Sequence, residues 1–184
     1  CSLILMGWKG YPSNARKILG EVVDNVVKNA RTDIILVKLD GDPRFDKLLL
    51  PTAGGDHAKC AEDYAASLVG SGKGSLTVCN IVPLEAPQEE VDEAWKRLDD
   101  AVERITENRE LKVDHLMIRH NSISVGIIQK AVDFDAVVIG GTNRTYPEIL
   151  FGSIPELVAK HSSKPVILVK HYQPIKALIS RIMS

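Results

Sequence analysis

The chain has 184 residues, of which 45% are hydrophobic, and its formal net charge is −1. This composition is typical of a globular protein, and the balance of charge gives no electrostatic basis for binding nucleic acid or an anionic membrane. No apolar run reaches the roughly 20 residues that a membrane-spanning helix needs. The three cysteines share no ligand spacing, which favours a reducing compartment over a disulfide framework.

Residues 1–39 predict a β-α-β unit. An apolar run is followed by a loop with glycines, a helical pattern, and a second buried strand at Ile34–Lys38. Residues 40–46, which contain Gly41, Asp42 and Pro43, predict a linker. Because the unit begins with a strand and has no initiating Met, we expect this chain to be the C-terminal part of a longer protein.

Residues 47–172 predict a complete domain in which strands and helices alternate. Short apolar runs, suited to strands buried on both faces of a sheet, are separated by amphipathic helical patterns. The predicted strands are 47–51, 75–82, 112–119, 136–139 and 166–170, and the helices between them begin near residues 56, 89, 122 and 153. This alternation predicts an α/β fold with an open parallel sheet covered by helices on both faces.

The segment around residue 153 predicts an anion-binding helix N-terminus. Gly140 and Gly141 end a buried strand, and a polar loop leads to Gly152 and Ser153. Ser153 followed three residues later by Glu156 is the pattern of a capping box, which predicts that the helix begins there. Exposed backbone N–H groups at such a helix start favour a phosphate group.

The β-α-β pattern occurs twice in the chain. Aligning Gly20 with Gly152 places Val26 on Val158 and the strand Ile35–Lys38 on Ile167–Lys170. Matching glycines and matching strand ends at one fixed offset indicate an internal repeat. We therefore predict that residues 1–39 are the last part of a first copy of the domain at 47–172.

The glycine spacing of the first copy, Gly7-x2-Gly10-x9-Gly20, resembles the phosphate-binding loop of the universal stress protein family. In the second copy Gly141, Gly152 and Ser153 match this pattern, whereas Arg144 replaces the middle glycine and the loop is two residues shorter. In the first copy Glu21 replaces the hydroxyl residue of the pattern. The resemblance implies a five-stranded sheet in the order 3-2-1-4-5.

The resemblance also implies a nucleotide site where the strand order reverses, between strands 1 and 4 of the second copy. Open α/β sheets bind ligands at such a point. The ligand expected there is ATP or AMP, with Mg²⁺. The predicted nucleotide-binding residues are Thr52, Ala53, Gly54, Ile81, Gly141, Arg144, Gly152 and Ser153, with Gly7, Gly10 and Gly20 forming an incomplete pocket in the first copy.

Two features leave nucleotide binding open. Ala53 stands where the family usually has an Asp that contacts adenine, so its side chain cannot accept a hydrogen bond from the base. A capping role accounts for Ser153 without any ligand, and Arg144 could equally be a solvent-exposed side chain. The alternative is that the loops have lost their ligand and the domain acts as a structural dimerisation module.

No catalytic residues are predicted, and the chain is not expected to be an enzyme. The sequence shows no pair that could act as nucleophile and base. His57 and Cys60 lie one helical turn apart without a third ligand nearby in sequence, so no metal site is predicted.

The motifs ILMGWKG and LLLPTAGG resemble the paired stress-protein domains at the cytoplasmic C-termini of prokaryotic amino-acid permeases. This resemblance implies a cytoplasmic regulatory or assembly module, tethered to the inner face of the membrane through a transporter region that precedes it. A stand-alone universal stress protein is the alternative. The family resemblance also implies pairing of the two fifth strands, Ile34–Lys38 and Val166–Lys170, with each other or with those of a second molecule.

The last segment, residues 173–184, predicts a short amphipathic helix. Its apolar residues recur at helical spacing: Ile175, Leu178, Ile179 and Ile182. We expect it to pack on a neighbouring surface, with attachment to a membrane surface as the alternative.

Overall fold

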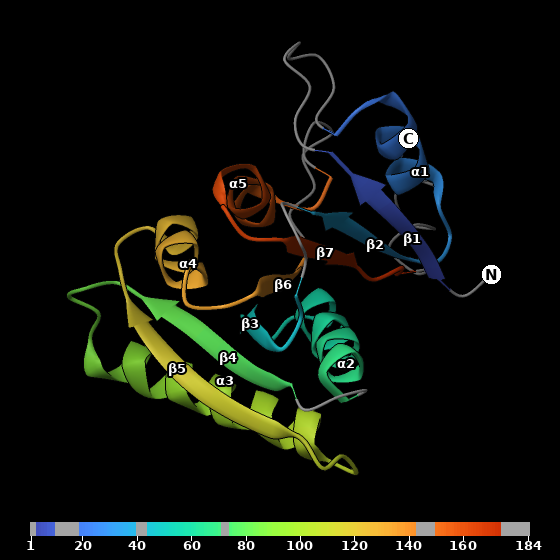
Figure 1. The fold of residues 1–184 in the computed structure, drawn as a ribbon. Coiled ribbons are helices and arrows are strands. Elements are labelled where there is room, and N and C mark those ends of the chain that lie inside the picture. Colours follow the sequence, from blue (N-terminus) through green and yellow to red (C-terminus); the bar gives the residue numbers. More distant parts are fainter. Residues whose placement is uncertain (1–2, 10–18, 40–43, 71–73, 143–149, 174–184) are drawn as a thin grey trace.

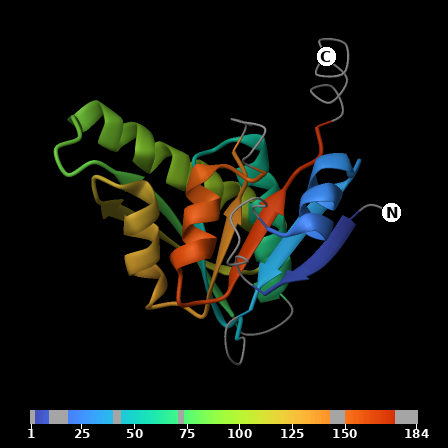
Figure 2. The same cartoon turned by 90° about the horizontal axis from the view of Figure 1, so that it is seen from above.

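A computed structural model of the chain describes residues 3–9, 19–39, 44–70, 74–142 and 150–173. Within these ranges, seven strands form one sheet with helices on both faces (Figures 1 and 2). The α/β class predicted from the sequence is therefore confirmed. The predicted C-terminal helix, apart from Gln173, lies outside the described residues.

The N-terminal unit consists of β1 (Leu3–Trp8), α1 (Glu21–Asn29) and β2 (Asp33–Lys38), and β1 and β2 are parallel neighbours. The remaining elements alternate along the chain. They are β3 (Lys47–Pro51), α2 (Asp56–Gly70), β4 (Ser75–Val82), α3 (Gln88–Thr106), β5 (Lys112–Arg119), α4 (Ile123–Ala131), β6 (Ala136–Gly140), α5 (Ser153–His161) and β7 (Val166–Lys170).

The strands of the described residues are ordered β1-β2-β7-β6-β3-β4-β5. The five strands from β3 to β7, numbered within their own unit, follow the predicted order 3-2-1-4-5. The sheet is larger than the predicted five strands because β2 and β1 continue it beyond β7. The N-terminal unit is thus part of the same sheet (Figure 2).

One junction in this parallel sheet is antiparallel. β2 runs against β7, with Leu36 opposite Leu168 at the centre and Ile34 opposite Lys170 at one end. Of the two arrangements predicted for these strands, pairing within one chain is the one present. β2 and β7 each have a neighbouring strand on both sides, so neither has a free edge with which to pair with a second molecule. Association between molecules stays a prediction.

Alternation along the strands divides the core between the two faces of the sheet. On β3, Leu48 and Leu50 pack on the face covered by α2 and α3, whereas Leu49 packs on the face of α1, α4 and α5. All three side chains are fully buried because β3 lies inside the sheet with helices on both faces. The edge strand β5 is more exposed, as its alternating polar sequence predicts.

No helix among the described residues has the length and apolar character required to cross a membrane.

The pairing of β2 with β7 predicts a large cost for Leu36→Ala. Leu36 is fully buried opposite Leu168, and truncation leaves a cavity between α1, α5 and the sheet. We expect the free energy of unfolding to fall by about 2–5 kcal/mol, measured by urea denaturation. The matched control is Leu5→Ala on β1, where 65% of the side chain is exposed and the expected cost is below about 1 kcal/mol. Equal costs would contradict the described packing.

Candidate functional site

A cavity of about 420 Å³ lies at the carboxyl ends of β3 and β6. It is where the strand order of the five-stranded unit reverses, since β4 and β6 lie on opposite sides of β3. The chain leaves β3 toward α2 on one face of the sheet and leaves β6 toward α5 on the other. The loops therefore separate and open a space between them.

Much of the lining of this cavity is apolar. Five isoleucines contribute to it, from the end of β4, from α4, from the end of β6 and from the first turn of α5: Ile81, Ile123, Ile127, Ile139 and Ile154. The polar residues of the lining include Thr52, His57, Asn80, Thr142, Glu90 and Arg97. A largely apolar lining with a few polar groups is the usual composition of a small-molecule site.

The polar side chains at the end of β3 hold the loops in place. The Asn80 side chain donates to the Thr52 carbonyl oxygen at 2.8 Å, and the Thr52 N–H donates to the Cys79 carbonyl oxygen at 2.9 Å. The Thr52 hydroxyl donates to Glu62 at 3.2 Å and accepts from the Gly54 N–H at 3.3 Å. These groups fix the shape of the cavity, and their bonds compete with any contact to a ligand.

An ion pair between the buried Glu62 and the partly exposed Arg104 holds Thr52 at the end of β3. Glu62 on α2 accepts two hydrogen bonds from Arg104 on α3, at 2.9 and 3.0 Å, besides the bond from Thr52. The bonds to Glu62 raise the pKa of Arg104, so the guanidinium stays charged. This pair connects the two helices of one face to the end of β3.

Close backbone approach explains the glycine at the end of β6. A Cβ on Gly140 would collide with backbone atoms of α2, namely the His57 carbonyl group and the Ala58 nitrogen. The next residue, Gly141, donates its N–H to the Val169 carbonyl oxygen at 2.7 Å. The end of β6 thus lies directly against the first turn of α2 and is bonded to β7.

Gly152 is required by its backbone conformation. It is the N-cap of α5 with φ of 108°, a value that residues with a side chain rarely adopt, and a Cβ there would collide with the side chain of Thr142. The Thr142 N–H donates to the Phe151 carbonyl oxygen at 2.7 Å. The start of α5 is thereby held beside the end of β6.

The predicted capping box is wrong. Ser153 is the first residue of α5, and the N-cap, Gly152, has no side chain with which to cap the helix. Glu156 instead accepts the N–H groups of Leu150 and Phe151, at 2.7 and 2.9 Å. Burial raises the pKa of Glu156, although these backbone bonds oppose the increase. Sequence spacing predicted the helix start correctly but not which group accepts these N–H bonds.

The predicted site residues fall into three groups. Four line the cavity: Thr52, Ala53, Ile81 and Gly141. Three do not line it: Gly54 and Ser153 are each next to a lining residue in the chain, and Gly152 lies two residues before Ile154. Arg144 and Gly10 lie outside the described residues, while Gly7 is in β1 and Gly20 is the N-cap of α1.

The isoleucines that line the cavity and His57 were not predicted as site residues from the sequence. Ile123, Ile127 and Ile154 lie on helices, where an apolar residue normally indicates the core, and their role at a cavity depends on how α4 and α5 sit over the sheet. His57 lines the cavity and its Nδ1 accepts the His171 N–H at 3.0 Å, a contact between distant segments. Only the fold brings these groups together.

Comparison with known proteins identifies one family. Residues 44–170 match the family model described as "Universal stress protein family". No curated protein matches the chain in sequence.

Three solved structures have the same fold. A universal stress protein from Archaeoglobus fulgidus DSM 4304 has a TM-score of 0.67 and 20% identity. The match covers 94% of this chain and 62% of that protein. A putative universal stress protein from Pseudomonas aeruginosa UCBPP-PA14 has a TM-score of 0.62 and 20% identity. The match covers 100% of this chain and 68% of that protein. A universal stress protein in complex with cAMP has a TM-score of 0.58 and 18% identity. The match covers 70% of this chain and 98% of that protein.

The contact between β6 and α2 predicts that Gly140→Ala destabilises the domain. The added methyl group collides with backbone atoms, which cannot rotate away, so α2 or β6 must shift. We expect a loss of about 1–3 kcal/mol in the free energy of unfolding, measured by urea denaturation. Gly55→Ala is the matched control in the same cavity, because no atom lies within 4 Å of its added Cβ. Unchanged stability of Gly140→Ala would contradict the close approach.

Proposed function

The chain belongs to the universal stress protein family, and we propose that it binds an adenine nucleotide, ATP or AMP, in the cavity at the ends of β3 and β6. One observation carries this proposal: a largely apolar cavity of about 420 Å³ lies next to the N-terminus of α5, at the point where the strand order reverses. Its size and composition suit a small organic ligand. The complex of a related protein with cAMP is consistent with this ligand class.

The phosphates would lie at the start of α5. The first turn of this helix lines the cavity through Ile154 and Pro155, and Ser153 at its first position is exposed. N–H groups at the start of a helix and the positive end of its dipole favour a negative charge. Gly152 has no side chain that would cover these groups. Mg²⁺ would accompany ATP as a phosphate-bound ion.

The base would pack on the isoleucines that line the cavity, among them Ile81. Ala53 offers no side-chain acceptor, and the amide of Asn80 is already bonded to the Thr52 carbonyl oxygen. Recognition would therefore depend on backbone groups and on shape. We expect a lower affinity and a weaker preference for adenine than a carboxylate at position 53 would give.

We propose that the site binds its nucleotide without hydrolysing it and acts as a sensor. The Thr52 hydroxyl is bonded to Glu62, and the buried Glu62 is paired with Arg104, so neither group is available as a base for water. Binding at the loops next to α5 would then affect the position of α5, and through it the strands that it covers.

We also propose that the N-terminal unit is the last part of a first copy of the domain. Gly20 and Gly152, equivalent in the repeat, have nearly the same backbone angles, φ 104° and ψ 154° against φ 108° and ψ 154°. Leu36 and Leu168, also equivalent, face each other across the β2–β7 junction. Equivalent residues meeting in this way are what a two-fold relation between two copies produces.

The paired arrangement suits a regulatory module attached to a larger protein. We propose a cytoplasmic module of a prokaryotic amino-acid transporter, on the basis of the ILMGWKG and LLLPTAGG motifs. A stand-alone stress protein is compatible with the same fold. Ala53 favours the remaining candidate, a pairing domain without ligand, and the following titration separates it from the sensor.

Calorimetric titration of ATP, and separately AMP, with and without Mg²⁺, tests the binding proposal. We expect binding in the wild-type chain and a loss of at least about tenfold in affinity for Ser153→Glu, because a carboxylate at the start of α5 repels the phosphates. The helix dipole favours that carboxylate, so the variant should stay folded. Ser163→Glu, an exposed serine after the end of α5, is the matched control and should bind as the wild type does.

A second variant separates a weak site from an absent one. Ala53→Asp supplies the missing acceptor on the cavity wall, and we expect about tenfold tighter binding of adenine nucleotides from one added charge-assisted hydrogen bond. If neither the wild type nor Ala53→Asp gives heat at millimolar nucleotide, the sensor proposal is wrong and the pairing role remains.

A further inference from the structure

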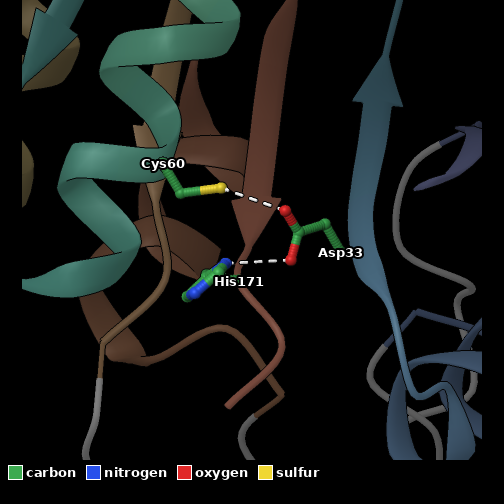
Figure 3. A group of neighbouring side chains, drawn as sticks. All are labelled: Asp33, Cys60 and His171. Atoms are coloured by element: carbon green, nitrogen blue, oxygen red, sulfur yellow. Dashed lines mark hydrogen bonds and ion pairs between the residues drawn. The ribbon is translucent and has the colours of Figure 1, made fainter. Parts of the chain in front are cut away.

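Three side chains of the types that bind metal ions come together from distant segments beside the β2–β7 junction. Asp33 begins β2, Cys60 lies on α2, and His171 follows β7 (Figure 3). Their ligand atoms all lie within 4.8 Å of one another. The Asp33 carboxylate contacts both of the others: Oδ1 lies 2.9 Å from His171 Nδ1, and Oδ2 lies 3.4 Å from Cys60 Sγ (Figure 3).

We propose that Asp33, Cys60 and His171 form a binding site for a divalent transition-metal ion of the Zn²⁺ class. A thiolate, an imidazole and a carboxylate are the three ligand types that Zn²⁺ takes in proteins, whereas Mg²⁺ and Ca²⁺ require oxygen ligands. Ligands of a tetrahedral zinc ion stand about 3.3–3.8 Å apart, so small side-chain rotations would close the site. A water molecule would complete the coordination.

Further contacts orient the carboxylate as a second shell does in metal sites. The backbone N–H of Tyr172 donates to Asp33 Oδ1 at 2.9 Å, and the Tyr64 hydroxyl donates to Oδ2 at 3.3 Å. Burial raises the pKa of Asp33, but the bonds from Tyr172, Cys60 and His171 outweigh it and lower the pKa overall. The carboxylate is therefore ionised and held in one orientation.

An ion can reach this group from solvent. The three side chains line an open cleft of about 510 Å³, together with Asp56, Lys59, Asp63, Tyr64 and Ser67. Three carboxylates and one ammonium group give this cleft a negative balance, which attracts a cation. The cleft and the cavity proposed for the nucleotide share no lining residue, so the two proposals are tested separately.

Metal binding must displace protons from the group. Burial, followed by the charge of Asp33, raises the pKa of the Cys60 thiol to about 12, so the thiol is protonated at neutral pH without a metal. Coordination through Sγ releases that proton, and coordination through His171 Nδ1 requires the ring proton to lie on Nε2. The affinity should therefore increase with pH.

The position of the site gives it a structural consequence. Asp33 belongs to the N-terminal unit, whereas Cys60 and His171 belong to the five-stranded unit. A bound ion would connect the two units at the end of their shared junction. An ion that binds only the folded chain raises its stability, so metal should raise the melting temperature.

Titration of the chelator-treated, full-length chain with Co²⁺ tests the site, in a Cys1→Ser background that removes a competing thiol. We expect one ion per chain, visible d–d bands of four-coordinate cobalt and a thiolate-to-cobalt charge-transfer band in the near ultraviolet. One equivalent of Zn²⁺ should abolish both. Affinity should rise with pH, and metal should raise the melting temperature.

Three variants and one control assign the ligands. Cys60→Ser should abolish the charge-transfer band, and each of Cys60→Ser, Asp33→Asn and His171→Gln should weaken Zn²⁺ binding at least about 100-fold, the upper end of what losing an outer-shell partner costs. His161→Gln, an exposed histidine at the end of α5, should change nothing. His171 is at the surface, so its variant should fold even if another does not, which circular dichroism checks.

Two results would overturn the site. One is the absence of a charge-transfer band in the Cys1→Ser chain with excess Co²⁺. The other is Zn²⁺ affinity that His171→Gln leaves unchanged, which would place the ion elsewhere.

Discussion

The antiparallel pairing of β2 with β7 is the constraint on which the rest of the structure depends. It joins the N-terminal unit to the five-stranded unit in one sheet and buries Leu36 against Leu168. Lysines reinforce it from both sides, since Lys38 donates to the Ser162 carbonyl oxygen at 2.9 Å and Lys170 to that of Val27 at 3.5 Å. Burial lowers the pKa of Lys170, although the charge of Glu156 opposes this. Lys38 of the N-terminal unit thus bonds at the end of α5, and Lys170 of the five-stranded unit bonds in α1.

The same pairing brings the two candidate sites into contact. The end of β7 carries His171, whose ring contacts Asp33 at the start of β2 and whose N–H donates to His57. His57 in turn lines the cavity at the ends of β3 and β6. One hydrogen bond therefore connects the proposed metal site to the proposed nucleotide site. α2 carries His57 in its first turn and Cys60 one turn later, so a shift of this helix would move a residue of each site.

The sequence predicted the elements well, because buried strands such as Lys47–Pro51 and glycines at strand ends leave strong local patterns. The strand order came from the family resemblance, and Gly141 and Ile81 were expected at the cavity for the same reason. The Asp33–Cys60–His171 group could not be predicted, since its members are far apart in sequence and meet only where β2 and β7 pair. The capping box failed for a different reason: spacing shows which groups are near a helix start, whereas the backbone angles of Gly152 decide how they bond.

Native-state hydrogen exchange tests most directly whether the two units form one body through the β2–β7 junction. If they do, buried amides of β2 and β7 should exchange through the same global opening, with equal free energies and equal dependence on denaturant. Leu36→Ala should lower both together. A single body is ruled out if the amides of β1, α1 and β2 exchange at a distinctly lower free energy while those of β7 keep the protection of the five-stranded unit. The junction would then be a weak contact between two independent parts.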